Sequence, residues 1–232
     1  MLKPDSESES ESTLRPLDWG LIGYEMALRQ QEHLVEEVAA SGEPGYLIFC
    51  SHPPVVTRGR KTLDDDVFGW EGQMVTVSRG GRATYHGPSQ EVIYPIFNLK
   101  RSERARSLGV VGVVRKLEQA IVETLAEYGV AASGKQAPAL ENGPSSTSSN
   151  GEETGVWVNE RKVASLGIAV RHWVSFHGAA LNVDWDPRAF QGLKPCGLRS
   201  EVMISLEELL GHRVDRGPLR QRLRTKINQL LR

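Results

Sequence analysis

Apolar residues recur along the chain with two different periods, which predict helices in some segments and strands in others. Spacing of three and four residues predicts a helix that begins at Asp18 and ends at the break over residues 41–45, and another over Gly109–Tyr128. The apolar stripe of the second helix is expected to face a core. Closing helices are predicted over Ser205–Leu210 and Leu219–Leu231.

Short apolar runs between these helices have the length and composition of strands. They cover residues Tyr46–Cys50, Met74–Ser78, Val92–Leu99, Val130–Ala132 and Val174–Asn182. Pro95, inside the third run, predicts an edge strand or a bulge because proline cannot donate to a ladder. Residues 156–158 and 162–170 predict a hairpin that turns at Asn159–Arg161. The chain is therefore expected to contain both helices and strands.

Two polar segments have too few apolar residues to take part in a packed core. Serine and glutamate alternate over residues 1–13, which predicts a disordered tail. Residues 136–153 predict a polar surface insertion. The remainder, residues 14–232, is expected to form a single domain, because the motifs on both sides of the insertion belong to one site.

Composition excludes several classes of protein without selecting a function. The chain of 232 residues is 39% hydrophobic and 25% charged, as in ordinary soluble globular proteins. A net charge of −1 argues against bulk nucleic-acid binding. No apolar run approaches the roughly 20 residues needed to cross a bilayer, and the N-terminal residues lack the apolar region of a secretory signal. Two cysteines do not make a disulfide framework and favour a reduced, cytoplasmic protein.

The C-terminal region is rich in cations. From His212 onward it holds seven Arg and Lys residues against one Asp. Such a run predicts a solvated helix face. It also fits a docking surface for acidic partners, which would include Arg220, Arg222 and Arg224.

Candidate chemistry centres on one cysteine and one lysine. Cys196 lies in a Pro-Cys-Gly turn that is expected to present its thiol outward, whereas Cys50 lies in an apolar strand and is typical of a core. Lys162 opens an apolar strand in phase with Ala164 and Leu166, which predicts an ammonium that points toward the interior. A lysine at a strand end also often extends to water, so both alternatives stay open.

If Lys162 and Cys196 lie close together, they form an activated-thiol pair. An ammonium about 4 Å from a thiolate is worth on the order of 4 kcal/mol at an effective dielectric of about 20, and desolvation reduces the net effect to about one to two pKa units. The thiol would then be largely ionised at neutral pH, whereas a free cysteine is ionised only to a few per cent. A neutral Lys162 could accept a proton from an amine, so the pair suits acyl transfer onto sulfur and then onto nitrogen.

Glycine-rich segments are candidates for the walls of a ligand pocket. Residues 79–90 combine free backbone N–H groups, cations and aromatic rings, although a hairpin with a glycine bulge explains them as well. Small residues after His177 leave room for a chain-like ligand, or mark a tightly packed bulge. Residues 58–60, Arg-Gly-Arg, predict a loop near an anion or a solvated basic loop. Candidates for an oxyanion hole are the backbone N–H groups around Gly167, Gly178 and Gly197.

Four sequence motifs occur in an order that resembles one family. RGGRATYHGPSQ, KVASLGI, WVSFHGAALNV and KPCG match, in order and spacing, the octanoyltransferases of lipoate biosynthesis, the lipoyl(octanoyl) transferases. The resemblance extends over roughly residues 17–210. It implies an α/β (α+β) fold, a mixed β-sheet flanked by helices, as in the catalytic domain shared by biotin- and lipoate-protein ligases.

The resemblance also implies a reaction and the residues that perform it. Octanoyl would pass from octanoyl-acyl carrier protein to Cys196 as a thioester. It would then pass to a lysine of a lipoyl domain, in a 2-oxoacid dehydrogenase E2 subunit or in the glycine-cleavage H protein. Lys162 matches the family lysine that lowers the thiol pKa, and no cofactor, metal, nucleic acid or membrane is implied. The acyl-binding segments of the family match Arg79, Gly80, Gly81, Arg82, Ala83, Thr84, Tyr85, His86, Ser165, Leu166, Gly167, Gly178, Ala179 and Ala180.

Three other functions stay open on the sequence. An ATP-dependent lipoate or biotin ligase has the same fold but needs no nucleophilic cysteine, and the chain has no Walker-type loop and no complete biotin-ligase Gly-Arg-Gly-Arg pattern. A thiol-dependent acyl hydrolase would use His177 or His86 with Cys196. A non-catalytic module would bind an acyl group or a carrier protein without reacting.

Overall fold

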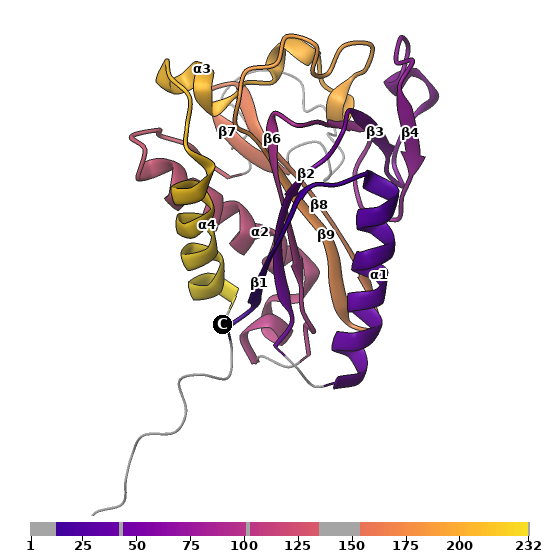
Figure 1. The fold of residues 1–232 in the computed structure, drawn as a ribbon, viewed down its shortest axis with the longest axis vertical. Helices are drawn as coiled ribbons and strands as arrows, with labels where there is room; N and C mark the ends of the chain where they lie inside the picture. Colours follow the sequence, from indigo (N-terminus) through magenta and orange to yellow (C-terminus); the bar gives the residue numbers. More distant parts are fainter. Residues whose placement is uncertain (1–12, 42–43, 101–102, 135–153, 232) are drawn as a thin grey trace, which may run out of the picture.

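The computed structural model describes residues 13–41, 44–100, 103–134 and 154–231 (Figure 1). The predicted tail over residues 1–13, except Thr13, and the predicted insertion over 136–153 lie outside these residues. The strands in chain order are β1 Arg15–Leu21, β2 Tyr46–Ser51, β3 Val55–Arg58, β4 Gln73–Thr76, β5 Thr84–His86, β6 Gln90–Ile96, β7 Gly155–Val158, β8 Arg161–Arg171 and β9 Val174–Asn182. The α-helices are α1 Tyr24–Ser41, α2 Glu103–Ala126, α3 Leu206–Leu210 and α4 Arg216–Leu231.

A mixed β-sheet forms the middle layer of the protein. Its strand order within the described residues is β1-β2-β6-β9-β8-β7, with β1 parallel to β2 and the other neighbours antiparallel. Helix α1 covers one face, and α2 and α4 cover the other (Figure 1). The expected mixed sheet flanked by helices is therefore confirmed.

Strand β2 shows why the sheet is buried on both faces. All six of its residues are buried, and they alternate between two hydrophobic clusters. Leu47 and Phe49 pack in the cluster with α2 and α4, whereas Ile48 and Cys50 pack in the cluster with α1. A strand between two helical layers therefore needs an unbroken apolar run, which is what the sequence has at this position.

Several predicted elements are confirmed with small changes in their bounds. Strand β9 has the predicted bounds, and β7 and β8 form the predicted hairpin, in which Val158 pairs with Arg161. The predicted stripe on α2 packs in the core through Val113, Leu117, Ile121 and Leu125, although Val110 at the start of the stripe is exposed.

The first predicted helix begins too early. Asp18 lies in strand β1, and α1 begins at Tyr24. Strand β1 lies at the edge of the sheet, most of its residues are exposed, and its register with β2 shifts between Asp18 and Gly20. An edge strand that is bulged and half exposed to solvent has no clear alternation of apolar and polar residues. The helical spacing of the residues that follow was therefore extended to Asp18 in the prediction.

The predictions for Pro95 and for residues 130–132 are also wrong. Pro95 lies in β6, between β2 and β9, and not in an edge strand. The ladder between β6 and β9 ends at Ile93 and Ala179, because Pro95 has no N–H to donate. The N–H of His177 in β9 donates instead to Gln31 Oε1 at 2.9 Å. Residues 130–132 form no strand, and a single bridge joins Ser133 to Trp157.

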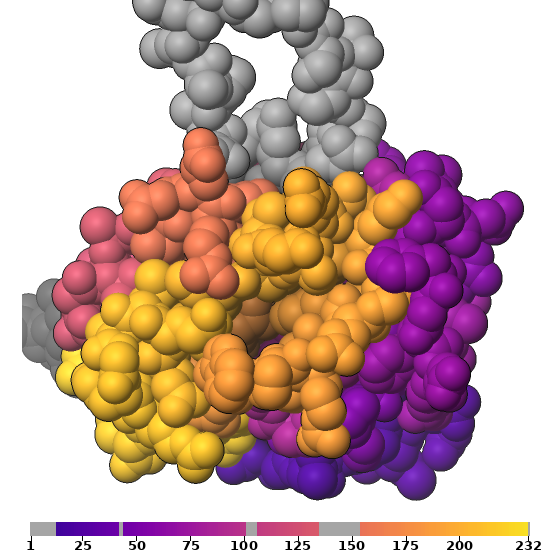
Figure 2. Space-filling model, turned by 90° about the horizontal axis from the view of Figure 1, so that it is seen from above, coloured from indigo at the N-terminus to yellow at the C-terminus, as the bar shows by residue number. Residues whose placement is uncertain are grey.

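A second, small sheet lies beside one end of the main sheet. It has the order β4-β3-β5, of which β3 and β5 lie in segments predicted as loops. The segment from Asn182 to Leu206 crosses the same end of the main sheet (Figure 1). Figure 2 looks down on this end and shows the surface hollowed among the orange segments around residues 175–200. The motifs singled out in the sequence meet here.

Candidate active site

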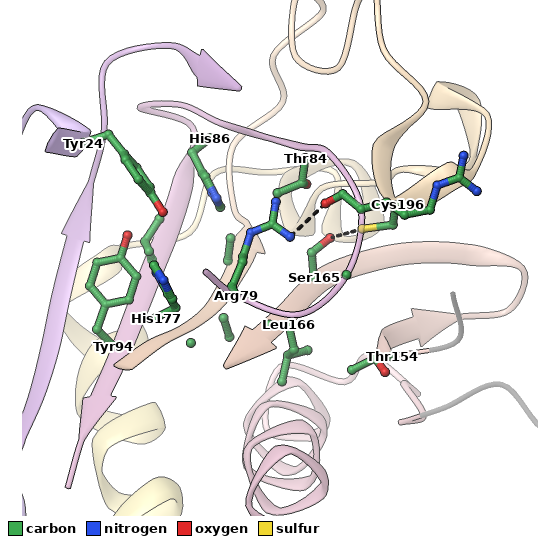
Figure 3. Close-up of a pocket in the computed structure, with 17 residues that line it drawn as sticks. Tyr24, Arg79, Thr84, His86, Tyr94, Thr154, Ser165, Leu166, His177 and Cys196 are labelled. Atoms are coloured by element: carbon green, nitrogen blue, oxygen red, sulfur yellow. Dashed lines mark hydrogen bonds between the residues drawn. The ribbon is translucent and has the colours of Figure 1, made fainter. Parts of the chain in front are cut away.

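A cavity lies between β8, β9, the loop before β5 and the Pro195–Gly197 turn (Figure 3). Most of the residues predicted to bind substrate line it. From that set they are Arg79, Gly81, Arg82, Thr84, His86, Ser165, Leu166, Gly167, Gly178, Ala179 and Ala180, together with Cys196. The cavity also has lining residues that the sequence analysis did not single out as ligand contacts, namely Tyr24, Val92, Tyr94, Thr154 and His177.

Three residues of the predicted set, Gly80, Ala83 and Tyr85, are not part of the cavity wall. The Tyr85 ring faces away from the cavity and packs edge-on against Trp70 and Phe190. Strand alternation explains this, because neighbouring residues of β5 point to opposite sides. Tyr85 is therefore buried in a hydrophobic cluster behind the cavity wall and does not line the cavity.

Cys196 lies in a tight turn that directs its thiol into the cavity (Figure 3). Its φ of 56° is in the left-handed region, and its N–H donates to Ala83 O at 2.7 Å. The thiol lies 3.8 Å from Ser165 Oγ. The predicted outward thiol is thus wrong, because the left-handed turn and the bond to Ala83 reverse the direction of the side chain.

A buried carboxylate supports the cysteine turn from outside the cavity. Asp66 is fully buried and forms a short ion pair with Arg82. A Cβ on Gly197, which has φ 82°, would collide with the Arg82 guanidinium. The Asp66 carbonyl also accepts the N–H of Lys194 at 2.7 Å. Sequence reasoning missed Asp66, and its only local signal is the run of three aspartates at residues 64–66.

Lys162 is fully buried, so the alternative in which it extends to water is wrong. Its position depends on a bulge in β8. Val156 pairs with Ala164, but the next residue of β7, Trp157, pairs with Lys162, so Val163 is an extra residue. A bulge changes the phase of the side chains along a strand. Val163 and Ala164 both pack in the core.

The bulge has a direct consequence for the candidate pair. Simple alternation would place Lys162 and Ser165 on opposite faces of β8. With the extra residue between them, Lys162 and Ser165 share a face of β8: the Ser165 hydroxyl lies 3.8 Å from the Cys196 thiol, and the charge of Lys162 lowers the pKa of that thiol. The prediction that Lys162 is in phase with Ala164 and Leu166 is therefore wrong, although the prediction of an inward ammonium is confirmed.

The walls around Lys162 are close and apolar. A Cβ on Gly155 would collide with Lys162 Cε, so only glycine leaves room for the lysine stem. The ammonium lies 5.3 Å from the ring centroid of Trp157, which is a cation–π contact. Within the part of the chain that the structure describes, Lys162 Nζ has no hydrogen-bond partner. A charge in this position is available to interact with Cys196.

Electrostatics favours a thiolate at Cys196. Burial by itself raises the pKa of this thiol, but the opposing charges of Lys162 and Arg79 and the Ser165 hydroxyl outweigh burial and hold the pKa below its ordinary value. Burial has the opposite outcome at Cys50, where it raises the pKa, and no cation compensates sufficiently. Of the two cysteines, Cys196 is therefore the one whose surroundings favour a thiolate.

The two histidines of the cavity wall are held neutral. Burial, followed by the charges of Arg79 and Arg60, lowers the pKa of His177 to about 3. Burial, with contributions from His52 and Arg79, lowers the pKa of His86 well below its ordinary value. His86 Nδ1 lies 3.2 Å from Gln90 Oε1, and His177 Nε2 lies 3.5 Å from Ser78 Oγ. The thiol lies 3.8 Å from Ser165 Oγ, and within the described residues no hydrogen bond joins it to either histidine.

The described residues contain no group of three or more His, Cys, Asp or Glu side chains arranged to hold a metal ion. In the same part of the chain, no helix combines the length and the apolar composition that crossing a membrane requires.

Comparison with known sequences gives a family for this geometry. The model of the "Lipoyl protein ligase A/B catalytic domain" matches residues 23–228. An octanoyltransferase of Bdellovibrio bacteriovorus is 49% identical over 219 residues, which are 92% of this chain and 97% of that protein. An octanoyltransferase of Geobacter metallireducens is 36% identical, with 92% of each chain covered.

Comparison with solved structures gives the same fold at low sequence identity. A lipoate-protein ligase A bound with ATP has a TM-score of 0.72 at 19% identity and covers 95% of this chain and 85% of its own. A putative lipoate protein ligase from T. acidophilum has a TM-score of 0.71 at 18% identity, with coverages of 94% and 85%. Biotin protein ligase from Aquifex aeolicus, in complex with biotin and ATP, has a TM-score of 0.53 at 15% identity, with coverages of 94% and 70%.

Proposed function

The chain belongs to the lipoyl protein ligase A/B catalytic-domain family, and from this premise we propose that it is an acyltransferase that moves an octanoyl group through Cys196. The donor is octanoyl-acyl carrier protein. The acceptor is a specific lysine of a lipoyl domain, in a 2-oxoacid dehydrogenase E2 subunit or in the glycine-cleavage H protein. The observation that carries the proposal is the thiol of Cys196, which is directed into a cavity and whose pKa is held below its ordinary value, chiefly by the charge of the buried Lys162.

In the first half-reaction, the Cys196 thiolate attacks the carbonyl carbon of the octanoyl thioester. The bond between that carbon and the donor sulfur breaks, and the donor leaves as a thiolate. Lys162 is the buried ammonium beside the reacting sulfur, so it can give its proton to the leaving sulfur. The products are the acylated cysteine, the donor thiol and a neutral Lys162.

In the second half-reaction, the acceptor amine attacks the carbonyl carbon of the acylated cysteine. Lys162, now neutral, accepts the proton that the amine loses. The bond between carbon and Cys196 Sγ breaks, an amide forms, and the thiolate and the ammonium are restored. One lysine thus acts as acid in the first step and as base in the second, which is why it must be buried close to the sulfur.

The apolar part of the cavity lining suits the chain part of the substrate. Ala179 and Ala180 in β9 leave space that larger side chains would fill, and Leu166 and Val92 contribute apolar walls. Burying an eight-carbon chain is worth up to about 5 kcal/mol at roughly 0.8 kcal/mol per methylene. This binding holds the acyl carbonyl next to Cys196 during both half-reactions.

Intact-mass spectrometry tests the proposal. The protein is mixed with octanoyl-acyl carrier protein in the absence of acceptor, and a mass increase of one octanoyl group is expected. Cys196→Ala should give no adduct, and addition of a lipoyl domain should discharge the wild-type adduct onto the acceptor lysine. An octanoylated acceptor that forms equally well with Cys196→Ala would exclude the cysteine route.

The same samples separate the other functions. A ligase of this fold would attach free octanoate or lipoate only with ATP, and Cys196→Ser would leave it largely active. A thiol-dependent hydrolase would release free octanoate without acceptor at a rate that matches transfer. A non-catalytic module would bind the carrier protein and form no adduct at all.

A further inference from the structure

Arg79 is a buried cation of the cavity wall. It precedes the two glycines of the Arg79–Arg82 segment, and only 7% of its surface is exposed. Figure 3 shows its side chain between Tyr24, Tyr94 and His177 on one side and Cys196 and Ser165 on the other. Its position between the acyl cavity and the reacting sulfur raises the question of what the guanidinium does there.

The hydrogen bonds of Arg79 exclude the usual role of an arginine in a binding site. Nη1 donates to Gly80 O at 3.1 Å and to Arg82 O at 2.8 Å. Nη2 donates to Thr57 O at 2.9 Å and to Thr57 Oγ1 at 2.7 Å. A guanidinium has five N–H donors, and four are used by the protein itself. The paired terminal N–H groups with which an arginine binds a carboxylate or a phosphate are therefore not available to a substrate.

These partners also leave the charge of Arg79 uncompensated. All four acceptors are neutral oxygens, Nε has no partner, and no carboxylate pairs with Arg79 among the residues the structure describes. A buried charge without a counter-ion is strongly disfavoured, because the protein interior does not replace the solvation that water gives it. Neutral acceptors fix the position of the guanidinium, so its charge is directed at the cavity.

We propose that Arg79 is a fixed cation of the reaction, which stabilises the Cys196 thiolate in the free enzyme and keeps Lys162 Nζ neutral in the acyl-enzyme. The second part of this proposal rests on the proposed octanoyl transfer. Both parts follow from the charge of the cavity before and after the sulfur is acylated.

Before acylation, two cations without a carboxylate partner act on Cys196, namely Lys162 and Arg79, and the anion is the thiolate, while Arg82 of the cavity wall is paired with Asp66. Acylation converts the thiolate into a neutral thioester, so the anion disappears while both cations remain. Two like charges in a water-poor site repel each other strongly. A guanidinium does not release its proton at neutral pH, whereas an amine can. Lys162 is therefore the group that gives up a proton, and it leaves the first half-reaction as the neutral base that the second requires.

The other groups that face Arg79 do not take over this role. Tyr24 from α1 and Tyr94 from β6 are buried phenols, and burial raises the pKa of Tyr24 to about 12 and the pKa of Tyr94 well above its ordinary value. His86 from β5 and His177 from β9 are neutral, as described above. Burial lowers the pKa of Arg79, and a charge on Cys196 opposes this effect. Cys196 is thus the group in this set whose negative charge matches Arg79.

Thiol alkylation tests the first part without any acyl substrate. The rate of Cys196 carboxamidomethylation is measured with iodoacetamide against pH for wild type and variants, after circular dichroism has shown that each is folded. Arg79→Gln, which can still donate to Thr57, and Arg79→Met are the neutral replacements. In both, the midpoint should move to a pH about one unit higher, so that alkylation at pH 6 falls about tenfold.

Two controls separate charge from structure. Arg79→Lys keeps the charge with fewer hydrogen bonds, so its midpoint should stay near that of wild type even if its rate changes. Thr57→Val removes one partner of Arg79 but leaves the charge in place, so its midpoint should also be unchanged. A purely structural Arg79 would give Arg79→Lys and Thr57→Val the same shift as the neutral variants.

The second part is tested on the isolated acyl-enzyme. Discharge of octanoyl from Cys196 onto a lipoyl domain is followed in a single turnover across the pH range. The rate midpoint of Arg79→Gln should move to higher pH, and that of Arg79→Lys should not. Equal midpoints in wild type, Arg79→Gln and Arg79→Met in both assays would overturn the proposal. If no acyl-enzyme forms on wild type, the proposed transfer fails, while the alkylation assay still decides the effect on the thiol.

Discussion

The cavity and helix α4 both carry several cations, but they treat them in opposite ways. In α4, Arg216 pairs with Asp184 at 2.6 Å, Arg220 pairs with Asp18 at 2.6 Å and Glu91 at 2.9 Å, and Lys226 pairs with Glu127 at 3.3 Å. Arg82 of the cavity wall pairs with Asp66, but Lys162 and Arg79, the two cations that lower the pKa of Cys196, pair with no carboxylate in the described residues. The same residue types thus hold the fold together in one region and remain available for chemistry in the other.

This difference changes the interpretation of the C-terminal cations. The sequence favoured a solvated helix face or a docking surface for acidic partners. The structure shows that several of these side chains join α4 to the body of the protein instead. An exposed cation gains little from such a pair, but one that reaches a buried carboxylate such as Glu91 removes a large desolvation cost. A buried cation without a carboxylate partner has no ion pair to offset its desolvation cost, so its presence in the protein points to a role in function.

The largest effect is expected at Lys162, where removing a cation that has no carboxylate partner should impair transfer but not stability. Lys162→Met removes the ammonium and keeps an unbranched stem of similar volume. Transfer should fall by roughly 10³-fold, because both the ionised thiol and the acid–base group are lost. The free energy of unfolding should stay the same or increase slightly, since a charge without a carboxylate partner leaves the interior. Single-turnover transfer and urea unfolding measure the two quantities.

The pH dependence of the same variant identifies the cause of the loss. Alkylation of Cys196 should require a higher pH than in wild type, since Lys162, the cation that lowers the thiol pKa most, is absent. A variant that loses transfer but keeps the wild-type alkylation profile would show that Lys162 does not act on the sulfur. Removal of a cation of α4 that pairs with a carboxylate should have the reverse effect and lower stability without lowering the rate of transfer.

Arg220→Met tests that reverse behaviour through the buried Glu91. Desolvation, only partly offset by Arg220, raises the pKa of Glu91 to about 7. The folded protein therefore keeps a proton that the unfolded chain has released, so wild-type stability falls as pH rises from 5 through 7. Without Arg220 the carboxylate is harder to ionise. The variant should lose about 2 kcal/mol at pH 8.5 and less than about 1 kcal/mol at pH 5.5.

Unfolding in urea at these two pH values measures the effect, and octanoyl transfer serves as the control. Transfer by the folded variant should be close to that of wild type. A loss of stability that is equal at both pH values would mean that Glu91 does not titrate in this range. A large loss of transfer with no loss of stability would place Arg220 with the cavity cations and remove the contrast.

Arg222→Ala should have the smallest effect. Arg222 forms an ion pair with Glu127 at the surface, where solvent screens both charges. Neither the midpoint of unfolding nor the KM for the octanoyl carrier protein should change measurably. An increase of several-fold in that KM, largest at low salt, would instead support the docking surface for acidic partners that the sequence left open.

Much of the fold follows from local patterns in the sequence. The buried strands β2 and β9 and the apolar stripe of α2 were predicted, because burial on a fixed face imposes a period that survives in the residues. Edge strand β1 and the short strands β3 and β5 were not, because their residues are held by pairing with neighbours and not by a periodic face. Tertiary pairing also decided that Pro95 lies in a central strand.

The candidate site divides in the same way. The sequence shows the residue types, a cysteine in a turn and a lysine in an apolar strand, and these predicted acyl transfer by an activated thiol. Their meeting depends on one extra residue at Val163, which turns Lys162 to the face of Ser165. The direction of the Cys196 thiol depends on a carbonyl of another loop, Ala83, and the support from Asp66 comes from a third segment.

The sequence by itself therefore determined which side chains are available and which segments are apolar enough to be buried. The tertiary structure decided which of those side chains share a cavity, which cations receive a carboxylate partner, and where the thiol points. The physical reason is range. Periodicity and turn preference act over a few residues, whereas the energy of a charge depends on every group packed around it, and those groups come from distant parts of the chain.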